Sequence, residues 1–280
     1  MLGLCNTFTS VSQPAVNRYK GTRSCVWDST SDFLYNSSAS STNTVLGMNR
    51  ISADTTYTQG ETKMMGTRGN PYCTDWSVVL WVKFTNEDAL ESLFSQAEGA
   101  NTGIELIKNT DNNLVIRLDD TDITGSTTLS NNTWYHIVVT FNDTTNDCIM
   151  YLNGSSEASN TNIDFDGFDS TNTAVYTWLG YSQNPADGFI GRMFEVAIYD
   201  KALSAANVTS LYNGGDVKDL RLHSTIGLPL YWFHMDNVGD LTTSTKMYNA
   251  THTKSSSSHF LCYNYLSGTN ITFVSDAPSS

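Results

Sequence analysis

The stretch Trp76-Ser-Val-Val-Leu-Trp-Val-Lys-Phe84 decides the fold class. Every second residue from Trp76 to Phe84 is apolar, which is the period of a β-strand. Val79 and Trp81 are apolar on the opposite face, so both faces are expected to be covered. The stretch therefore predicts an inner strand of a β-sandwich.

Further apolar or alternating stretches recur every one or two dozen residues along the chain. They lie at 114–118, 134–141, 148–152, 174–181 and 189–199. Asn153-Gly154 directly follows one of them, and this pair is a strong hairpin signal because both residues accept positive φ. Strands at this density, separated by polar turns, predict an all-β jelly-roll sandwich.

One short helix and two arms complete the expected organisation. The helix is predicted over 205–212, with Ser204 as its N-cap and a glycine pair after it. Residues 1–21 are polar and irregular and are expected to form an N-terminal arm. The sandwich is expected over 22–215, and residues 216–280 as an extension that packs on the sandwich or on neighbouring subunits.

Composition excludes several classes of protein. The 280 residues carry a formal net charge of −13. This negative charge repels the phosphate groups of nucleic acids, so we expect no nucleic-acid partner. No run approaches 18 apolar residues, so no membrane insertion is expected, and the N-terminus lacks a signal-peptide pattern. The five cysteines show no CxxC spacing and are expected to be small buried hydrophobes.

The order of these elements resembles the laminin-G-like, concanavalin A-like jelly-roll family. The pieces that carry the resemblance are 76–83, 132–141, 151–154, 178–181 and 189–204, with an opening strand at 24–34. The resemblance covers about residues 22–215 and implies a jelly-roll β-sandwich. This family includes lectins, glycosidases and adhesion modules, so the fold leaves the function open.

The C-terminal extension is similar to the segment that follows such domains in tailed-phage particle proteins. The similarity rests on Gly227-Leu-Pro-Leu-Tyr-Trp-Phe-His-Met-Asp236, Met247-Tyr-Asn249 and Ile271-Thr-Phe-Val-Ser-Asp-Ala-Pro278. It implies a virion structural protein, made in the host cytoplasm and displayed on the virion surface as a capsid decoration, cement or fibre subunit. Its expected partners are major capsid or tail proteins and further copies of itself.

Residues for catalysis are sparse. A retaining glycosidase needs two carboxylates about 5 Å apart, and hydrolases of this superfamily commonly supply them in a Glu-x-Asp-x-x-Glu pattern. The chain lacks that pattern: Glu105 has no carboxylate partner nearby, and Glu195 is expected as a structural polar residue near a sheet edge. His136 lies mid-strand and is expected to pack or hydrogen-bond. We therefore expect no enzymatic activity and no catalytic residues.

Calcium is the one cofactor that the sequence suggests. Asp164, Asp166 and Asp169 surround a glycine turn, and the segment 119–122 offers three more carboxylates. Calcium takes six to eight oxygen ligands, and short Asp-rich loops can present several of them. The alternative is that both segments are solvated turns of an acidic protein.

A carbohydrate site is the alternative to a purely structural role. Tyr176 and Tyr181 could form an aromatic platform, with Asn184 and Asp187 as hydrogen-bonding groups in the following loop. Trp178, between the two tyrosines, is instead expected to pack in the core. Such a site would make the protein a host-attachment module that binds surface glycans, with or without calcium.

Overall fold

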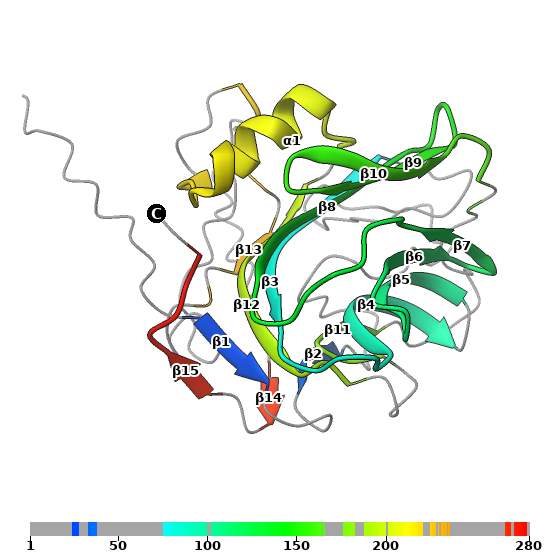
Figure 1. Cartoon of the computed structure of the whole chain (residues 1–280). Helices are drawn as coiled ribbons and strands as arrows, with labels where there is room; N and C mark the ends of the chain where they lie inside the picture. Colours follow the sequence, from blue (N-terminus) through cyan, green and yellow to red (C-terminus); the bar gives the residue numbers. More distant parts are fainter. Residues whose placement is uncertain are drawn as a thin grey trace, which may run out of the picture.

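Two antiparallel sheets pack face to face in the computed structural model, with one short helix outside them (Figure 1). The structure describes residues 24–27, 33–37, 75–99, 102–163, 165, 176–182, 188–199, 201–220, 225–227, 229, 231–233, 235, 267–269 and 272–278. This nearly all-β sandwich confirms the predicted jelly-roll fold class.

The larger sheet is built from eight strands of the described part of the chain. They are β1 (Ser24–Trp27), β3 (Trp76–Phe84), β8 (Trp134–Asn142), β9 (Asp147–Leu152), β10 (Ser155–Asn160), β12 (Gly191–Tyr199), β13 (Tyr231–Phe233) and β15 (Thr272–Val274). Their order is β10-β9-β8-β3-β12-β1-β15, and β13 also pairs with β12. The predicted inner strand is β3, which lies between β8 and β12, so that prediction is confirmed.

The smaller sheet holds the other described strands. They are β2 (Phe33–Ser37), β4 (Glu91–Gly99), β5 (Thr102–Lys108), β6 (Leu114–Leu118), β7 (Thr121–Thr124), β11 (Tyr176–Leu179) and β14 (Ser267–Thr269). Their order is β14-β2-β11-β4-β5-β6-β7. The first and last described strands of the chain therefore meet twice, as β1 with β15 and as β2 with β14 (Figure 1, blue and red).

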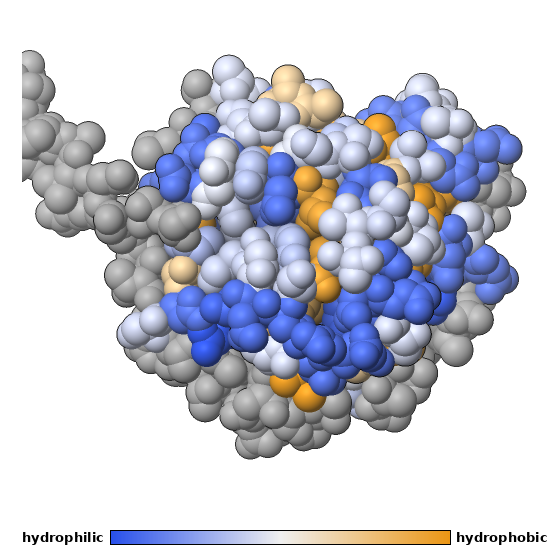
Figure 2. All heavy atoms as spheres, in the orientation of Figure 1, coloured by the Kyte–Doolittle hydropathy of each residue, from blue (hydrophilic) through white to orange (hydrophobic). Residues whose placement is uncertain are grey.

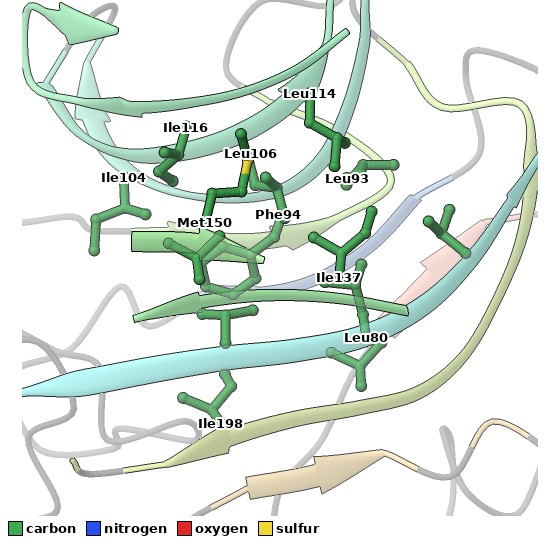
Figure 3. Packing of buried hydrophobic residues seen from close by; sticks show 14 of the residues in the cluster. Leu80, Leu93, Phe94, Ile104, Leu106, Leu114, Ile116, Ile137, Met150 and Ile198 are labelled. Carbon is green, nitrogen blue, oxygen red and sulfur yellow. The ribbon is translucent and has the colours of Figure 1, made fainter. Parts of the chain in front are cut away.

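The main hydrophobic core fills the space between the two sheets (Figure 3). The core residues of the smaller sheet include a cross-strand row made of Leu179, Phe94, Leu106, Ile116 and Ile123. The larger sheet contributes aliphatic side chains from its central strands β3, β8 and β12. Because one row of the smaller sheet faces the core, the residues one position along each strand face away from it.

The helix α1 (Ala205–Tyr212) covers part of the outer face of the larger sheet. Ser204 caps it as predicted, since its Oγ accepts a hydrogen bond from the Asn207 N–H at 3.2 Å. The helix ends in the short 3₁₀ turn η1 (Asn213–Gly215). A second apolar cluster lies between helix and sheet, made of Val79, Val138, Tyr151, Ala197, Tyr199, Leu203, Val208, Leu211, Leu220, Ile226 and Trp232.

The hairpin predicted from Asn153-Gly154 is confirmed. It joins β9 to β10, with Leu152 paired to Ser155. Asn153 has φ +49° and Gly154 has φ +80°, which is the conformation that a two-residue type I′ turn requires. The Thr209 hydroxyl of α1 donates a hydrogen bond to the Gly154 carbonyl at 3.1 Å, so the turn also anchors the helix.

Glu195 does not lie near a sheet edge, contrary to the expectation from sequence. It lies in a bulge of β12, where the pairing with β3 shifts between Phe194 and Ala197, and its φ is +51°. It is 2% exposed, and its carboxylate accepts a hydrogen bond from the Trp232 indole. Burial, and then the charge of Glu195, raise the pKa of the Tyr199 hydroxyl. Glu195 therefore joins β12 to β13 inside the packed layer.

Hydrophilic residues cover most of the molecular face shown in Figure 2, and hydrophobic ones appear there only in narrow strips. Within the described ranges, no helix has the length and apolar character needed to cross a membrane.

Candidate functional site

The outer face of the smaller sheet carries a row of aromatic and polar side chains. The strand register pairs Trp178 with Ser95, Ser95 with Glu105, Glu105 with Arg117, and Arg117 with Asp122. The adjacent row lies in the core, so this row faces outward. With neighbouring strands about 4.8 Å apart, the row spans roughly 19 Å from β11 to β7. We call Trp178, Tyr181, Glu105, Arg117 and Asp122 the outer row.

The aromatic end of the outer row is a pair of rings. The ring centroids of Trp178 and Tyr181 are 5.3 Å apart, with planes tilted by 52°. Both residues are half-buried. The Tyr181 carbonyl accepts hydrogen bonds from the Ser92 and Ser95 hydroxyls, each at 3.1 Å. These two bonds hold the chain after β11 against β4 and thereby position the ring pair.

Trp178 is not a core residue, so that prediction was wrong. The core position on β11 belongs to its neighbour Leu179, which is buried among the residues between the sheets. Because successive strand residues face opposite sides, Trp178 is placed on the outer face. The sequence 176–179 is apolar or aromatic at three of its four positions, so its alternation did not reveal which residue faces inward.

The charged end of the outer row is an ion-pair network centred on Arg117. Its Nε and Nη2 donate to the two Asp122 oxygens at 2.7 and 3.0 Å, and its Nη1 donates to Glu105 Oε2 at 3.2 Å. The hydrogen bonds with Asp122 are the largest of the effects that raise the pKa of Arg117. One guanidinium is shared by two carboxylates, so this end of the row is net negative.

This arrangement suits the binding of a carbohydrate. A sugar ring has an apolar face that packs on an aromatic ring, while its hydroxyls need hydrogen-bond partners. Carboxylates accept hydrogen bonds and a guanidinium donates them, each in a fixed planar geometry. The outer row places both kinds of group on one face of a rigid sheet.

Part of this site is predicted from the sequence. Tyr181 lies beside Trp178 in the outer row. Tyr176 is the first residue of β11 and pairs with Ala97, but its side chain lies outside the described part of the structure. Asn184 and Asp187 also lie outside the described residues. Their assignment to a carbohydrate site stays a prediction.

Glu105 and Arg117 were missed as partners, although the sequence contains a signal. They flank a polar turn, 109–113. In the sequence, Glu105 lies as many positions before Asp111 as Arg117 lies after it. Residues placed in this way on two strands of a hairpin are cross-strand neighbours. Recognising β5 and β6 as a hairpin would have predicted the ion pair.

The first calcium candidate cannot be placed. Asp164, Asp166 and Asp169 lie outside the described residues. Phe165, between the first two, is described and buried, and its ring is nearly perpendicular to that of Phe141, with centroids 5.5 Å apart. Calcium binding by the three aspartates stays a prediction.

The second calcium candidate, 119–122, forms the tight turn between β6 and β7. Asp119 Oδ1 accepts a hydrogen bond from the Gly103 N–H at 2.7 Å, and Asp122 is held by Arg117. Among the described residues, no group of three His, Cys, Asp or Glu side chains is arranged to hold a metal ion. Asp119 therefore holds β5 at Gly103, and Asp122 belongs to the outer row.

A buried ion pair lies at one end of the sandwich, away from the outer row. Lys108 Nζ is 3.1 Å from Glu91 Oε2, and both side chains are at most 1% exposed. Lys108 also donates to the carbonyls of Asn86 and Ala89, and Glu91 Oε1 accepts from the Ile190 N–H at 2.8 Å. Burial raises the pKa of Glu91, against the opposing effects of Ile190 and Lys108. Both charges are engaged in holding loops.

His136 has the packing role that the sequence analysis favoured. It is 1% exposed, and its ring packs against those of Trp81 and Tyr212, with centroids 4.9 and 5.9 Å away; these two rings also stack on each other, with centroids 6.0 Å apart. Burial lowers the pKa of His136 to about 3, so the ring is neutral at physiological pH. The ring is enclosed between the larger sheet and α1 and is not accessible for catalysis.

The two sheets, their register and the outer row define a lectin-like jelly roll. Residues 55–209 match the family model Laminin_G_3, described as the concanavalin A-like lectin/glucanases superfamily. The match spans more than half of the chain, and the chain belongs to this superfamily. No curated protein matches it.

Several solved structures are similar in fold. A Bacteroides ovatus protein, described as a candidate carbohydrate-binding protein, aligns with a TM-score of 0.56 and 14% identity over 92% of this chain. The chain spans 61% of that protein's length. A heptameric SAP-like pentraxin from Limulus polyphemus has a TM-score of 0.46 and 13% identity, covering 69% of this chain and 82% of its own. The CBM40 of a Ruminococcus gnavus sialidase has a TM-score of 0.43 and 19% identity. The alignment covers 49% of this chain and 82% of the CBM40 chain.

Proposed function

We propose that the protein is a non-enzymatic carbohydrate-binding protein whose binding surface is the outer row. The observation that carries the proposal is the position of the Trp178–Tyr181 ring pair in line with the Glu105–Arg117–Asp122 network on one sheet face. The rings would pack on a sugar face, and the network would bind its hydroxyls.

The absence of enzymatic activity is part of the proposal. A retaining glycosidase needs one carboxyl group to deliver a proton and a second to act as nucleophile. In the outer row, Glu105 and Asp122 are both hydrogen-bonded to Arg117. Glu91 is paired with Lys108 in the interior. These contacts favour a binding surface over a catalytic pair.

The setting that we propose is the surface of a tailed-phage particle, where the protein is a capsid decoration, cement or fibre subunit. The C-terminal residues that resemble phage particle proteins include β15, which pairs with β1, and Asp276, which contacts Lys83. Many weakly binding copies on one particle would attach it to host glycans through avidity.

A glycan array tests the binding surface. The full-length protein should bind at least one host-surface glycan saturably, and Trp178→Ala should weaken this binding about ten-fold or more, the effect of losing about 1.4 kcal/mol. Trp134→Ala is the matched control, because Trp134 is also half-buried but lies on β8 of the other sheet. Equal binding by both variants would contradict the assigned surface, and no binding by the wild type would contradict the function.

The particle setting has its own test. Quantitative mass spectrometry of density-purified particles should find the chain among the structural proteins. Hundreds of copies per particle would indicate a capsid lattice, and a few dozen or fewer would indicate a tail or fibre. Complete absence from particles would contradict this setting and leave the carbohydrate-binding proposal standing.

A further inference from the structure

We infer that the outer row selects uncharged, hydroxyl-rich glycans over glycans that carry carboxylate or sulfate groups. The inference rests on the proposed function, because it names the class of ligand for the same surface. It is carried by the way in which Arg117 is bound by its neighbours.

Arg117 is already occupied by protein carboxylates. Three of its nitrogens donate to Glu105 and Asp122, and two of these hydrogen bonds form a bidentate pair with Asp122. Bidentate pairs between arginine and carboxylate are among the stronger ion pairs in proteins. These contacts use three of the five N–H donors of the guanidinium, so a ligand anion at the other two would have to share the charge of Arg117 with Glu105 and Asp122.

The surrounding charges also oppose an anionic ligand. Asp119 and Asp120 form the turn next to the Arg117–Asp122 pair, and Asp119 is held there by the Gly103 N–H. Glu105 and Asp122 both pair with the single guanidinium, so this end of the outer row carries a net negative charge. A carboxylate or sulfate brought to this end of the row would be repelled, and this repulsion would weaken at high salt.

The same carboxylates favour hydroxyl groups. An ionised carboxylate has about four acceptor positions on its two oxygens. The Arg117 contacts take one position on Glu105 and two on Asp122. The remaining positions accept hydrogen bonds from sugar hydroxyls, and bonds to a charged acceptor are stronger than those between neutral groups.

The test compares oligosaccharides that differ only in charge. Calorimetric titration of the full-length protein would use neutral mannose or glucose oligosaccharides and uronate oligosaccharides of equal length and linkage. The neutral ligands should bind about ten-fold or more tightly at low salt, and the difference should shrink at high salt. Tighter binding of the uronates would overturn the inference but leave the proposed function intact, whereas no binding of either class would contradict the proposed function.

Two variants with the same change of net charge locate the cause. Asp122→Asn removes one partner of Arg117, and it should narrow the preference for neutral ligands several-fold. Asp120→Asn is the control, since its side chain is exposed at the turn and is not hydrogen-bonded to Arg117. An equal effect of both variants would assign the selectivity to net charge and overturn the role of Arg117. If Asp122→Asn folds poorly, Glu105→Gln makes the same test from the other side of the guanidinium.

Discussion

Asp276 and Lys83 lie 193 positions apart in the sequence, and Lys83 Nζ donates to Asp276 Oδ2 at 2.8 Å. The same carboxylate forms an ion pair with Arg192 and accepts a hydrogen bond from Trp134 Nε1 at 3.3 Å. Lys83 lies between Arg192 and Trp134 on three neighbouring strands. Burial, and then the nearby Arg192, lower the pKa of Lys83. The Asp276 carboxylate, which follows β15, therefore compensates the charges of two adjacent cations on the larger sheet, Lys83 and Arg192.

Replacing Asp276 should destabilise the protein. In Asp276→Asn the two cations lose their shared partner and repel each other, so we expect a loss of about 1 kcal/mol, smaller at high salt. Denaturant unfolding at low and high salt measures both effects. Asp216→Asn, at an exposed position after η1, makes the same charge change and should cost little. An equal loss of unfolding free energy in the two variants would contradict this role of Asp276.

Lys108→Met should be more damaging. It leaves Glu91 buried without its cation, and breaking a buried pair in this way typically costs about 3–5 kcal/mol. The pKa of Glu91 is already raised by burial and would rise further without Lys108. The ionised group is the one that opposes folding, so the loss should be largest at neutral pH and shrink as the pH falls through that pKa.

The double variant Glu91→Gln with Lys108→Met is the control for this pair. It removes both charges and should recover part of the lost stability, because no uncompensated charge remains. The measurement is the free energy of unfolding of all four proteins in a double-mutant cycle. A double variant that is as unstable as the sum of its singles would show that the two charges do not act together.

Gly154→Ala should destabilise the β9–β10 hairpin by about 2–3 kcal/mol. The φ of +80° is strained for alanine, and the added Cβ would lie 2.8 Å from Tyr212 Cδ1 in α1. Gly214→Ala is the matched control: its φ is +71°, but the added Cβ meets no atom within 4 Å. It should cost about 1 kcal/mol from backbone strain alone. Thermal unfolding of the two variants compares their losses of stability. Equal losses would mean that the Tyr212 side chain moves away from the added Cβ at no cost in free energy.

Stability should fall in acid because of His136. Its ordinary pKa is 6.5, and burial lowers this to about 3 in the folded protein. The unfolded chain therefore binds a proton that the folded chain does not. The stability is fully present above pH 6.5 and is lost as the pH falls toward 3, at up to about 1.4 kcal/mol per pH unit.

His136→Phe tests this origin of the acid sensitivity. Phenylalanine keeps a ring packed against Trp81 and Tyr212 and cannot bind a proton. The His136 Nδ1 has no hydrogen-bond partner in the described structure, so the substitution breaks no bond there. The pH dependence of unfolding free energy should become shallower by about one proton between pH 6.5 and about 4. An unchanged slope would mean that other groups cause the acid sensitivity.

The sequence predicted the parts of the fold whose side chains follow a simple period. β3, β6, β8, β9 and β12 were found within a residue or two because apolar residues alternate or run together in them. β4 was missed because several of its buried residues are polar, among them Glu91, Ser92, Ser95 and Gln96. These side chains are buried because their strand is central in the smaller sheet, and that position depends on pairings made across the whole chain.

The candidate site was less predictable than the fold. Tyr181 was identified from the clustering of aromatic residues. The inward or outward direction of Trp178 could not be inferred, because it depends on which residue of β11 pairs with Phe94 in the core row. Glu195 was misplaced for a similar reason, since a bulge of β12 and the late strand β13 together enclose it. Positions of this kind depend on strand register, which short sequence patterns do not fix.

The pairing of the earliest strands with the latest ones has a consequence for synthesis on the ribosome. β1 and β2 emerge first, yet the described strands that pair with them are β11, β12, β14 and β15. The backbone groups of β1 and β2 therefore stay unpaired in the sheets until β11 and the later strands have been translated. During that interval they are open edges that can pair with a neighbouring nascent chain on the same messenger. The sandwich closes only after β15 has been translated, so a chaperone that covers β1 and β2 until then would raise the yield of folded protein more than one that acts later.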